Sequence, residues 1–248
     1  MKKLYQFNYL SRILFLLITP TIFRALNFAF IWHSIYWGVI TFVVLIWGLL
    51  ILISPLLGRV GCGWVCFMGT IQDLASEKSI VKLKWKKPIL WHRALWFIMF
   101  FGTAITFLII NIKSGKTEGI NYNPSFLHLD LNDHYKHVWI YDTFGAVILG
   151  LLLERRWCCK NSCPIGSLCA MGAKYSRLIP VVNINNCNNC GLCEKECLVK
   201  IPILDYIKSN NGLVTNSECL NCGKCVNVCK HNAITIKFIW NRKKFNRN

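Results

Sequence analysis

Two runs in the C-terminal third of the chain repeat one cysteine pattern. CNNCGLCEKEC at residues 187–197 and CLNCGKCVNVC at residues 219–229 both read C-x-N-C-G-x-C-x-x-x-C. Thiols at such short and regular intervals indicate metal ligation. Disulfide-rich secreted domains are small and poor in apolar core, which this chain is not. The repeat therefore predicts thiolate-bound metal in this third of the chain.

The spacing C-x2-C-x2-C-x3-C resembles that of bacterial two-cluster ferredoxins, in which three cysteines of one run bind a [4Fe-4S] cube and the fourth reaches the other cube. A zinc module is the alternative. Zinc takes four ligands, commonly as two separated C-x2-C pairs, and has no use for a third and a fourth cysteine in each run. The resemblance implies two [4Fe-4S] clusters with these ligand sets: Cys187, Cys190 and Cys193 with Cys229, and Cys219, Cys222 and Cys225 with Cys197.

The sequence around the repeats fits the small α+β fold of such ferredoxins. The β-prone run LVTNS precedes the second repeat and AITIKF follows it. Gly191 and Gly223 are expected to relieve crowding where each loop wraps its cluster. The ferredoxin pattern has a proline after the fourth cysteine, and Leu198 and Lys230 stand there instead. We therefore expect a less rigid turn at these two positions.

The rest of the chain is rich in apolar residues. Over the whole chain 54% of residues are hydrophobic and 16% are charged, and the mean hydropathy is +0.39, which favours a membrane protein over a soluble domain. An uncharged stretch such as residues 35–57 is long enough to cross about 30 Å of hydrocarbon. The predicted spans are residues 13–32, 35–57, 94–112 and 138–153. The first contains Pro20 and Arg24, so it is either a tilted span or two shorter pieces with Arg12 and Arg24 reaching opposite interfaces.

The net charge of +18 is compatible with nucleic-acid binding, because Lys and Arg neutralise phosphates. Here, however, basic residues flank the apolar stretches, as the positive-inside rule and anionic lipid head groups require. We expect a membrane and no nucleic-acid partner. Residues 58–93 carry seven Lys or Arg against two acidic residues, and residues 113–136 carry three of each sign. This asymmetry predicts that the basic loop, the N-terminus and everything after the fourth span are cytoplasmic.

Two further pairs of cysteines follow the second and fourth predicted spans. Cys62 and Cys66 lie in GRVGCGWVCFMG, and Cys159 and Cys163 lie in RRWCCKNSCPIG. By the topology both pairs reach the same cytoplasmic face, where they can approach each other and the ferredoxin-like domain. Four thiolates can bind a further metal centre, act as a dithiol relay or stabilise the fold, whereas a disulfide is disfavoured because cytoplasmic thiols are kept reduced. The spare thiols nearby are Cys158 and Cys169.

A multi-span membrane part with two C-x3-C motifs at inner helix ends, followed by a double-cluster ferredoxin domain, resembles the NapH/NosR-type membrane polyferredoxins. The resemblance covers about residues 10–235. It implies an iron–sulfur electron carrier of the cytoplasmic membrane that draws electrons from quinol and passes them to a redox partner. The family motif C-x3-C-P is matched at Cys163 and Pro164, whereas Phe67 follows Cys66.

These patterns together predict a membrane α-helical bundle of about four transmembrane helices at residues 1–175, a small α+β two-cluster bacterial-ferredoxin-like domain at residues 176–240, and a basic tail at residues 241–248. The expected function is electron transfer between the quinol pool or a membrane partner and a redox partner protein through two [4Fe-4S] clusters, either as a carrier subunit or as a quinol dehydrogenase component. Quinone and a further metal centre are the other expected cofactors. The predicted ligands of that further centre are Cys62, Cys66, Cys159 and Cys163. The alternative function is a metallocentre-assembly or thiol-redox polyferredoxin, whose C-x3-C thiols handle a metal ion rather than electrons.

Overall fold

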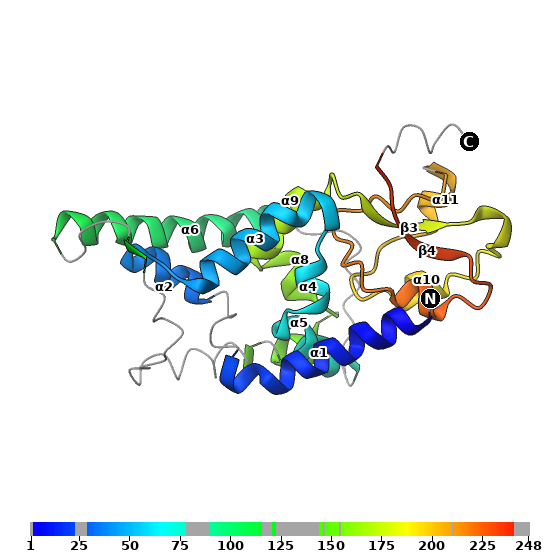
Figure 1. Cartoon of the computed structure of the whole chain (residues 1–248), viewed down its shortest axis with the longest axis horizontal. Helices are drawn as coiled ribbons and strands as arrows, with labels where there is room; N and C mark the ends of the chain where they lie inside the picture. Colours follow the sequence, from blue (N-terminus) through cyan, green and yellow to red (C-terminus); the bar gives the residue numbers. More distant parts are fainter. Residues whose placement is uncertain are drawn as a thin grey trace.

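The computed structural model describes residues 2–22, 29–77, 90–115, 121–122, 144–145, 147–153, 155–209 and 211–240. Figure 1 shows a helical part at one end of an elongated molecule and a small domain at the other. The helices of the first part are α1 (Lys2–Ile22), α2 (Ala29–Trp37), α3 (Phe42–Leu57), α4 (Val60–Trp64), α5 (Phe67–Glu77), α6 (Leu90–Lys113), α8 (Trp157–Asn161) and α9 (Pro164–Ala173). Two short strands, β1 (Val39–Ile40) and β2 (Asn121–Tyr122), pair in parallel.

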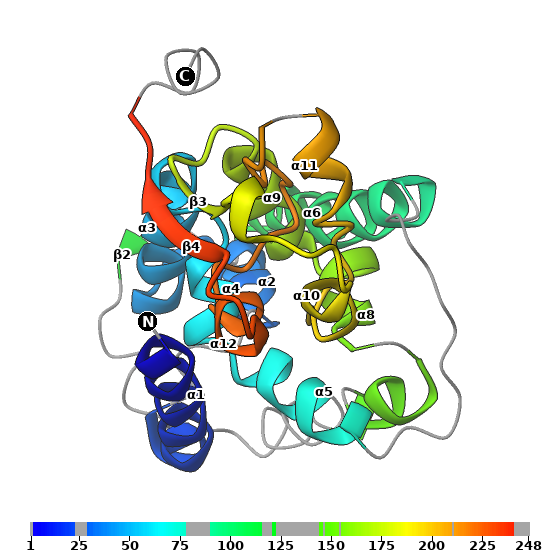
Figure 2. The ribbon, with the colours of Figure 1, turned by 90° about the vertical axis from the view of Figure 1, so that its right-hand side faces the viewer.

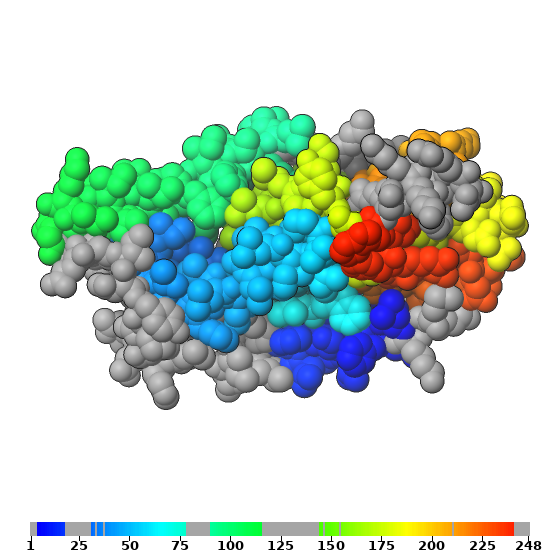
Figure 3. Space-filling view, turned by 45° about the horizontal axis from the view of Figure 1, so that its top comes forward, coloured from blue at the N-terminus to red at the C-terminus, as the bar shows by residue number. Residues whose placement is uncertain are grey.

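One helix of the described residues, α6, is long and apolar enough to cross a membrane. It contains the predicted span 94–112, and most of its surface is apolar and exposed, as at Trp91 and Ile98. Figure 3 shows α3, α9 and α6 on one face of the helical part, where α9 contacts both other helices. Helix α3 adds further exposed leucines, including Leu52.

The predicted count of four spans is not reproduced among the described residues. The stretch 35–57 is divided, because α2 ends at Trp37 and Gly38 takes a positive φ of 65° before α3 begins. The 16 residues of α3 extend over about 24 Å, less than a hydrocarbon core of about 30 Å. Most of residues 138–146 lie outside the described part, and residues 147–152 are helical.

The predicted span 13–32 differs most from the structure. Helix α1 already begins at Lys2 and packs along α4 and α5 as far as the small domain (Figure 1). Arg12 does not reach an interface with water or lipid. It is only 3% exposed. Its charge is tolerated inside the protein because it forms an ion pair with the buried carboxylate of Asp73. Arg24 lies outside the described residues.

The small domain is built on an antiparallel pair of strands, β3 (Leu178–Val182) and β4 (Ile234–Phe238), with Val182 opposite Ile234. The run AITIKF forms β4 as predicted, whereas LVTNS contributes only an isolated bridge between Leu213 and Val181. The intervening helices are η3 (Ile184–Asn186), α10 (Leu192–Lys195), α11 (Asp205–Ser209) and α12 (Lys224–Val228). Figure 2, seen from this end, shows α10 and α12 close together, and these two helices are in contact.

Candidate functional site

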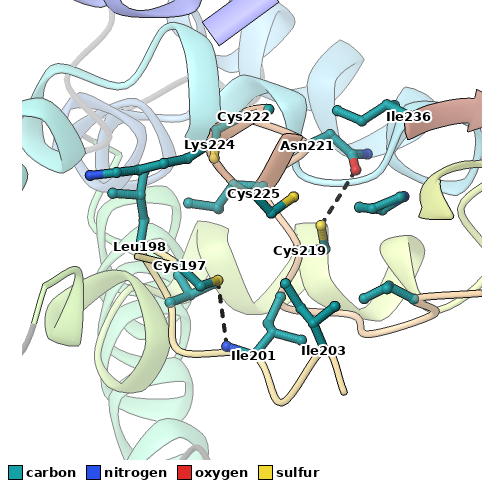
Figure 4. A pocket seen from close by; sticks show the side chains of 15 residues that line it. Cys197, Leu198, Ile201, Ile203, Cys219, Asn221, Cys222, Lys224, Cys225 and Ile236 are labelled. Carbon is teal, nitrogen blue, oxygen red and sulfur yellow. Dashed lines mark hydrogen bonds between the residues drawn. The ribbon is translucent and has the colours of Figure 1, made fainter. Parts of the chain in front are cut away.

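Four cysteines line a cavity within the small domain. Three of them, Cys219, Cys222 and Cys225, come from the second run, and Cys197 is the fourth cysteine of the first run. Figure 4 shows their thiols around one space, which apolar side chains such as Ile203 also line. We call these four residues the inner cysteine set.

A second cavity is lined by the other four cysteines of the two runs. Cys187, Cys190 and Cys193 of the first run line it together with Cys229, the last cysteine of the second run. We call these four residues the outer cysteine set, because Cys190 is exposed to solvent. The structure thus brings together the two crossed groups that the ferredoxin resemblance implies.

The two cysteine loops have the same backbone. Asn189 and Asn221, at equivalent positions, have φ of 56° and 50°, and Gly191 and Gly223 have φ of 72° and 77°. Positive φ is costly for most residues and readily adopted by Gly and, to a lesser degree, Asn. In the C-x-N-C-G sequence, the cysteines supply the sulfurs, and the asparagine and the glycine are suited to the positive φ that the loop requires.

The turns after the fourth cysteines are also alike. Lys200 and Asn232, each three residues beyond that cysteine, have φ of 55° and 50°. The next residue donates its backbone N–H to the cysteine sulfur, from Ile201 to Cys197 at 3.5 Å and from Ala233 to Cys229 at 3.3 Å. Both turns are thus closed without the proline of the ferredoxin pattern, so the absence of proline leaves them well defined.

The thiols of both sets fit a cofactor that supplies positive charge. Burial raises the pKa of Cys219 to about 12 and that of Cys193 to about 11, and neighbouring sulfurs contribute to both rises. Burial likewise raises the pKa of Cys225, and the sulfurs of the inner set add to the rise. Clustered thiolates are stable only when a bound cation compensates their negative charge. The thiols therefore lose their protons when metal binds.

These shifts predict that the metal-free protein loses stability in alkali. Because the folded pKa of Cys219 lies above the ordinary value of about 8.5, the folded state holds a proton that the unfolded chain has released above that pH. Stability must then fall as the pH rises from about 8.5 towards 12. Urea unfolding of the chelator-treated protein at about pH 7 and pH 10 measures this fall. In a Cys193→Ser, Cys219→Ser variant the fall should be smaller, and an equal fall contradicts the prediction.

The inner cysteine set is packed against the first C-x3-C segment. Gly63 of α4 lies so close to the loop that a Cβ there would be 2.3 Å from the Leu220 carbonyl oxygen. Trp64 donates its Nε1–H to the carbonyl of Asn221 at 3.2 Å. The Asn221 side chain in turn donates to the carbonyl of Leu57 at the end of α3. The small domain and the helical part therefore share one interface at the inner set.

All four C-x3-C cysteines lie near this interface. Cys62 is in α4, Cys66 precedes α5, Cys159 is in α8, and Cys163 caps α9, where its sulfur accepts the N–H of Gly166 at 3.3 Å. Burial raises the pKa of Cys163, and the sulfurs of Cys158, Cys62 and Cys66 add to the rise. The two pairs are thus within electrostatic range of each other.

Cys62 differs from its neighbours. A hydrogen bond from the Cys169 thiol, together with the nearby charge of Arg59, lowers the pKa of Cys62 below that of an ordinary thiol. Cys169, which the sequence offered only as a spare ligand, is therefore a direct partner of the first pair. Among the described residues, no three His, Cys, Asp or Glu side chains converge closely enough to hold a single metal ion.

Two buried ion networks flank the C-x3-C pairs, and the sequence patterns did not reveal them. Glu218, next to Cys219, binds Arg59 and, at 2.6 Å, Arg93. Asp73 binds Arg12 and, at 2.7 Å, Arg156. The available signal was a longer repeat, R-x2-C-x3-C-x2-G, which occurs at residues 59–69 and again at residues 156–166.

Comparison with known proteins agrees with this geometry. The family model of a 4Fe-4S binding domain matches residues 39–88 and 137–181, and that of a 4Fe-4S dicluster domain matches residues 186–234. The ferredoxin-type protein NapH of Escherichia coli is 28% identical over 73% of this chain and 63% of its own length. As predicted, the chain is similar to the NapH/NosR-type polyferredoxins. It is a ferredoxin-type protein with 4Fe-4S binding domains.

Other relatives in this family differ in how much of their length is matched. An uncharacterized protein of Methanocaldococcus jannaschii is 26% identical over 78% of this chain and 71% of its own length. The methylamine utilization ferredoxin-type protein MauN of Methylobacillus flagellatus is 27% identical over 73% of this chain and 62% of its own. The chain thus spans less than two thirds of NapH and MauN. No solved structure gives a significant match.

Proposed function

We propose that this chain is an electron-carrier subunit of the cytoplasmic membrane. It passes single electrons between the quinol pool, or a membrane partner, and a redox partner protein. The inner and outer cysteine sets each hold one [4Fe-4S] cluster in this proposal. It rests on one observation above all, namely two adjacent cavities that are each lined by three cysteines of one run and the fourth of the other.

The surroundings of the sulfurs support a one-electron role. When bound, such a cluster accepts or releases one electron without breaking a bond to the protein. The protein holds the sulfurs on closed turns and donates backbone N–H groups to Cys197 and Cys229. Hydrogen bonds and burial of this kind set the reduction potential of iron–sulfur sites.

The two sets differ in what surrounds them, and this suggests an order of transfer. The outer set contains the exposed Cys190, so a redox partner can approach it closely. The inner set is packed on α4 and α3 through Gly63 and Asn221. We therefore place the partner at the outer set and the membrane donor beyond the inner set.

The membrane orientation in this proposal is the one predicted from charge, with the N-terminus, the C-x3-C motifs and the ferredoxin-like domain in the cytoplasm. Fewer basic residues support this orientation than the sequence suggested. Arg59 and Arg93 were counted in the basic loop, but Arg59 is buried, Arg93 is partly buried, and both form ion pairs with Glu218. The five remaining basic residues of that loop are Lys78, Lys82, Lys84, Lys86 and Lys87, which lie outside the described residues.

Purification under anaerobic conditions, followed by iron analysis and electron paramagnetic resonance, tests the cluster sites. Cys219→Ala, Cys222→Ala should lose about four iron atoms per chain relative to the parent, and Cys187→Ala, Cys190→Ala should lose about four others. Cys158→Ala, outside both sets, is the matched control and should lose none. A parent with zinc in place of iron, or variants that keep all their iron, would overturn the assignment.

The donor is tested on the same parent protein in lipid vesicles. Added quinol should reduce the clusters and produce their resonance signals in the absence of air. In the Cys219→Ala, Cys222→Ala variant the outer cluster should no longer be reduced, because the inner site lies on the path. Clusters that dithionite reduces but quinol does not would exclude quinol as the donor while leaving the cluster sites in place.

A further inference from the structure

Two exposed aromatic side chains lie at one end of the antiparallel pair β3–β4. Phe238 is 49% exposed and Trp240 is 72% exposed, and the centroids of their rings are 6.0 Å apart. Ile239, between them in sequence, is buried, because successive side chains of an extended segment point to opposite faces. The two rings therefore share one exposed face, which we call the aromatic pair.

Arg177 holds Trp240 in this position. The guanidinium carbon of Arg177 lies 4.3 Å from the centroid of the Trp240 ring, within the range of a cation–π interaction. The guanidinium also donates to the carbonyl oxygen of Trp240. The carbonyl oxygen of Arg177 accepts the N–H of Ile239 at 2.8 Å, so the pairing of the two segments continues beyond Phe238. Trp240 is thus fixed in place while its side chain stays exposed.

The aromatic pair adjoins the end of α3. The backbone N–H of Arg177 donates to the carbonyl oxygen of Leu56, in the last turn of α3, at 3.0 Å. Figure 3 shows the end of β4, in red, next to α3 and α9. One side of α3 carries a row of exposed leucines, since residues at this spacing share a helix face: Leu45, Leu49, Leu52 and Leu56. The exposed apolar surface therefore continues from α3 onto the small domain.

Helix α6, the membrane-capable helix, begins at the same end of the helical part. Near its start Arg93 donates to Ser167 of α9 at 2.7 Å, and α9 also contacts α3. Trp91, in the first turn of α6, is 71% exposed. Tryptophan is enriched at the boundary between hydrocarbon and water. Trp91 and Trp240 thus occupy the end of the apolar helices where such a boundary is expected.

The segments that carry this surface are basic. Residues 164–182 and 234–240 contain Lys174, Arg177 and Lys237 and neither Asp nor Glu. Lys174 and Lys237 are exposed. Basic residues near a bilayer surface are attracted by anionic lipid head groups. An aromatic patch alone would also suit a protein partner, but the continuity with α3 and α6 and the positive charge favour lipid.

We propose that Phe238 and Trp240 anchor the small domain to the surface of a lipid bilayer, with the three basic residues facing anionic head groups. Aromatic rings with an adjacent cation suit this depth, because the ring enters the apolar boundary while the charge stays in water. The proposal rests on the membrane location in the proposed function. It adds which face of the small domain lies on the bilayer.

This face determines the direction of the outer cysteine set. Phe238 is paired with Leu178 at one end of β3–β4, and Ile234 is paired with Val182 at the other. Val182 and Ile234 line the outer cavity. The anchor therefore turns the outer set, with the exposed Cys190, away from the bilayer and towards a soluble partner.

Labelling from photoreactive lipids tests the anchor. The full chain is placed in nanodiscs that contain phosphatidylglycerol and a lipid with a diazirine near its head group. After irradiation, mass spectrometry maps the labelled residues. Label should appear at residues 238–240 and at Trp91. Ile184 is the matched control, because it is 47% exposed and apolar but lies beyond the Val182 end of β3, and it should stay unlabelled.

The possible outcomes separate the anchor from the membrane location. Label at Trp91 without label at residues 238–240 overturns the anchor and leaves the membrane location standing, since a protein or water then covers the aromatic pair. Label at neither position contradicts both. Equal label at Ile184 and at Trp240 would mean that the small domain meets lipid without a preferred face, which also overturns the anchor.

The role of the basic residues is tested with the variant Lys174→Gln, Lys237→Gln. In nanodiscs with phosphatidylglycerol its label at residues 238–240 should be lower than that of the parent by about twofold or more, with unchanged label at Trp91. In nanodiscs of phosphatidylcholine alone the two proteins should be labelled alike. Thermal unfolding verifies that the variant keeps the fold. Equal labelling of the two proteins in both lipids would contradict the attraction to anionic head groups.

Discussion

Glu218→Gln is expected to lower the free energy of unfolding by about 3–5 kcal/mol, as the loss of one partner from a buried ion pair does. The change leaves Arg59, with a side chain 0% exposed, and Arg93, 12% exposed, without their carboxylate. Glu218 belongs to the small domain, and Arg59 and Arg93 belong to the helical part. Without these ion pairs the small domain should also separate more easily from the helical part. Urea unfolding in detergent, followed by the visible absorption of the clusters, measures both effects.

Glu196→Gln is the matched control for this change. Glu196 also faces two cations, Lys224 at 3.4 Å and Arg155 at 3.8 Å, but its side chain is 33% exposed. Solvent screens such a pair, so the cost should stay below about 1 kcal/mol. Equal losses in the two variants would show that the Glu218 network does not hold the parts together.

Gly63→Ala should produce the second large effect. Its Cβ would lie 2.3 Å from a backbone oxygen, that of Leu220, which cannot move without displacing the inner cysteine loop. We expect a loss of about 1–3 kcal/mol, typical of overpacking, and slower reduction of the clusters by quinol, because α4 and the loop move apart. Stopped-flow absorption and urea unfolding measure the two changes.

Gly48→Ala serves as the comparison. Gly48 lies inside α3, and a Cβ there would meet no atom within 4 Å. Alanine is a better helix former than glycine by about 1 kcal/mol, so this variant should be as stable as the parent or more so. If Gly63→Ala behaved like Gly48→Ala, the close contact at Leu220 would not limit the interface.

The grouping of the cysteines was the part of the site that the sequence predicted best. The spacing of sulfur ligands is local, so the doubled run led to the two crossed groups that now line separate cavities. The strand at Ile234–Phe238 followed from its β-branched residues. Its partner, Leu178–Val182, was missed because the run LVTNS, nearer to the second repeat, offered a competing β signal.

The helical part was harder to predict from the sequence, because hydropathy counts apolar residues and does not detect ion pairs between distant residues. Arg12 was expected to avoid the interior, but Asp73 lies 61 positions away in sequence and supplies its counter-charge. Gly38 interrupts an apolar stretch that contains no charge to mark the break. The arginines beside the cysteine pairs were visible only as a repeat, and their roles depend on partners brought close by folding.

The bonds of Arg59 have a consequence for the order in which the chain matures. Its acceptor at Cys159 comes 100 residues later and its carboxylate at Glu218 comes 159 residues later. While the ribosome is still making those segments, the Arg59 guanidinium, at the start of α4, has neither partner, so it remains hydrated. Closure around the sulfurs is then a late step of biogenesis that waits for the C-terminal residues.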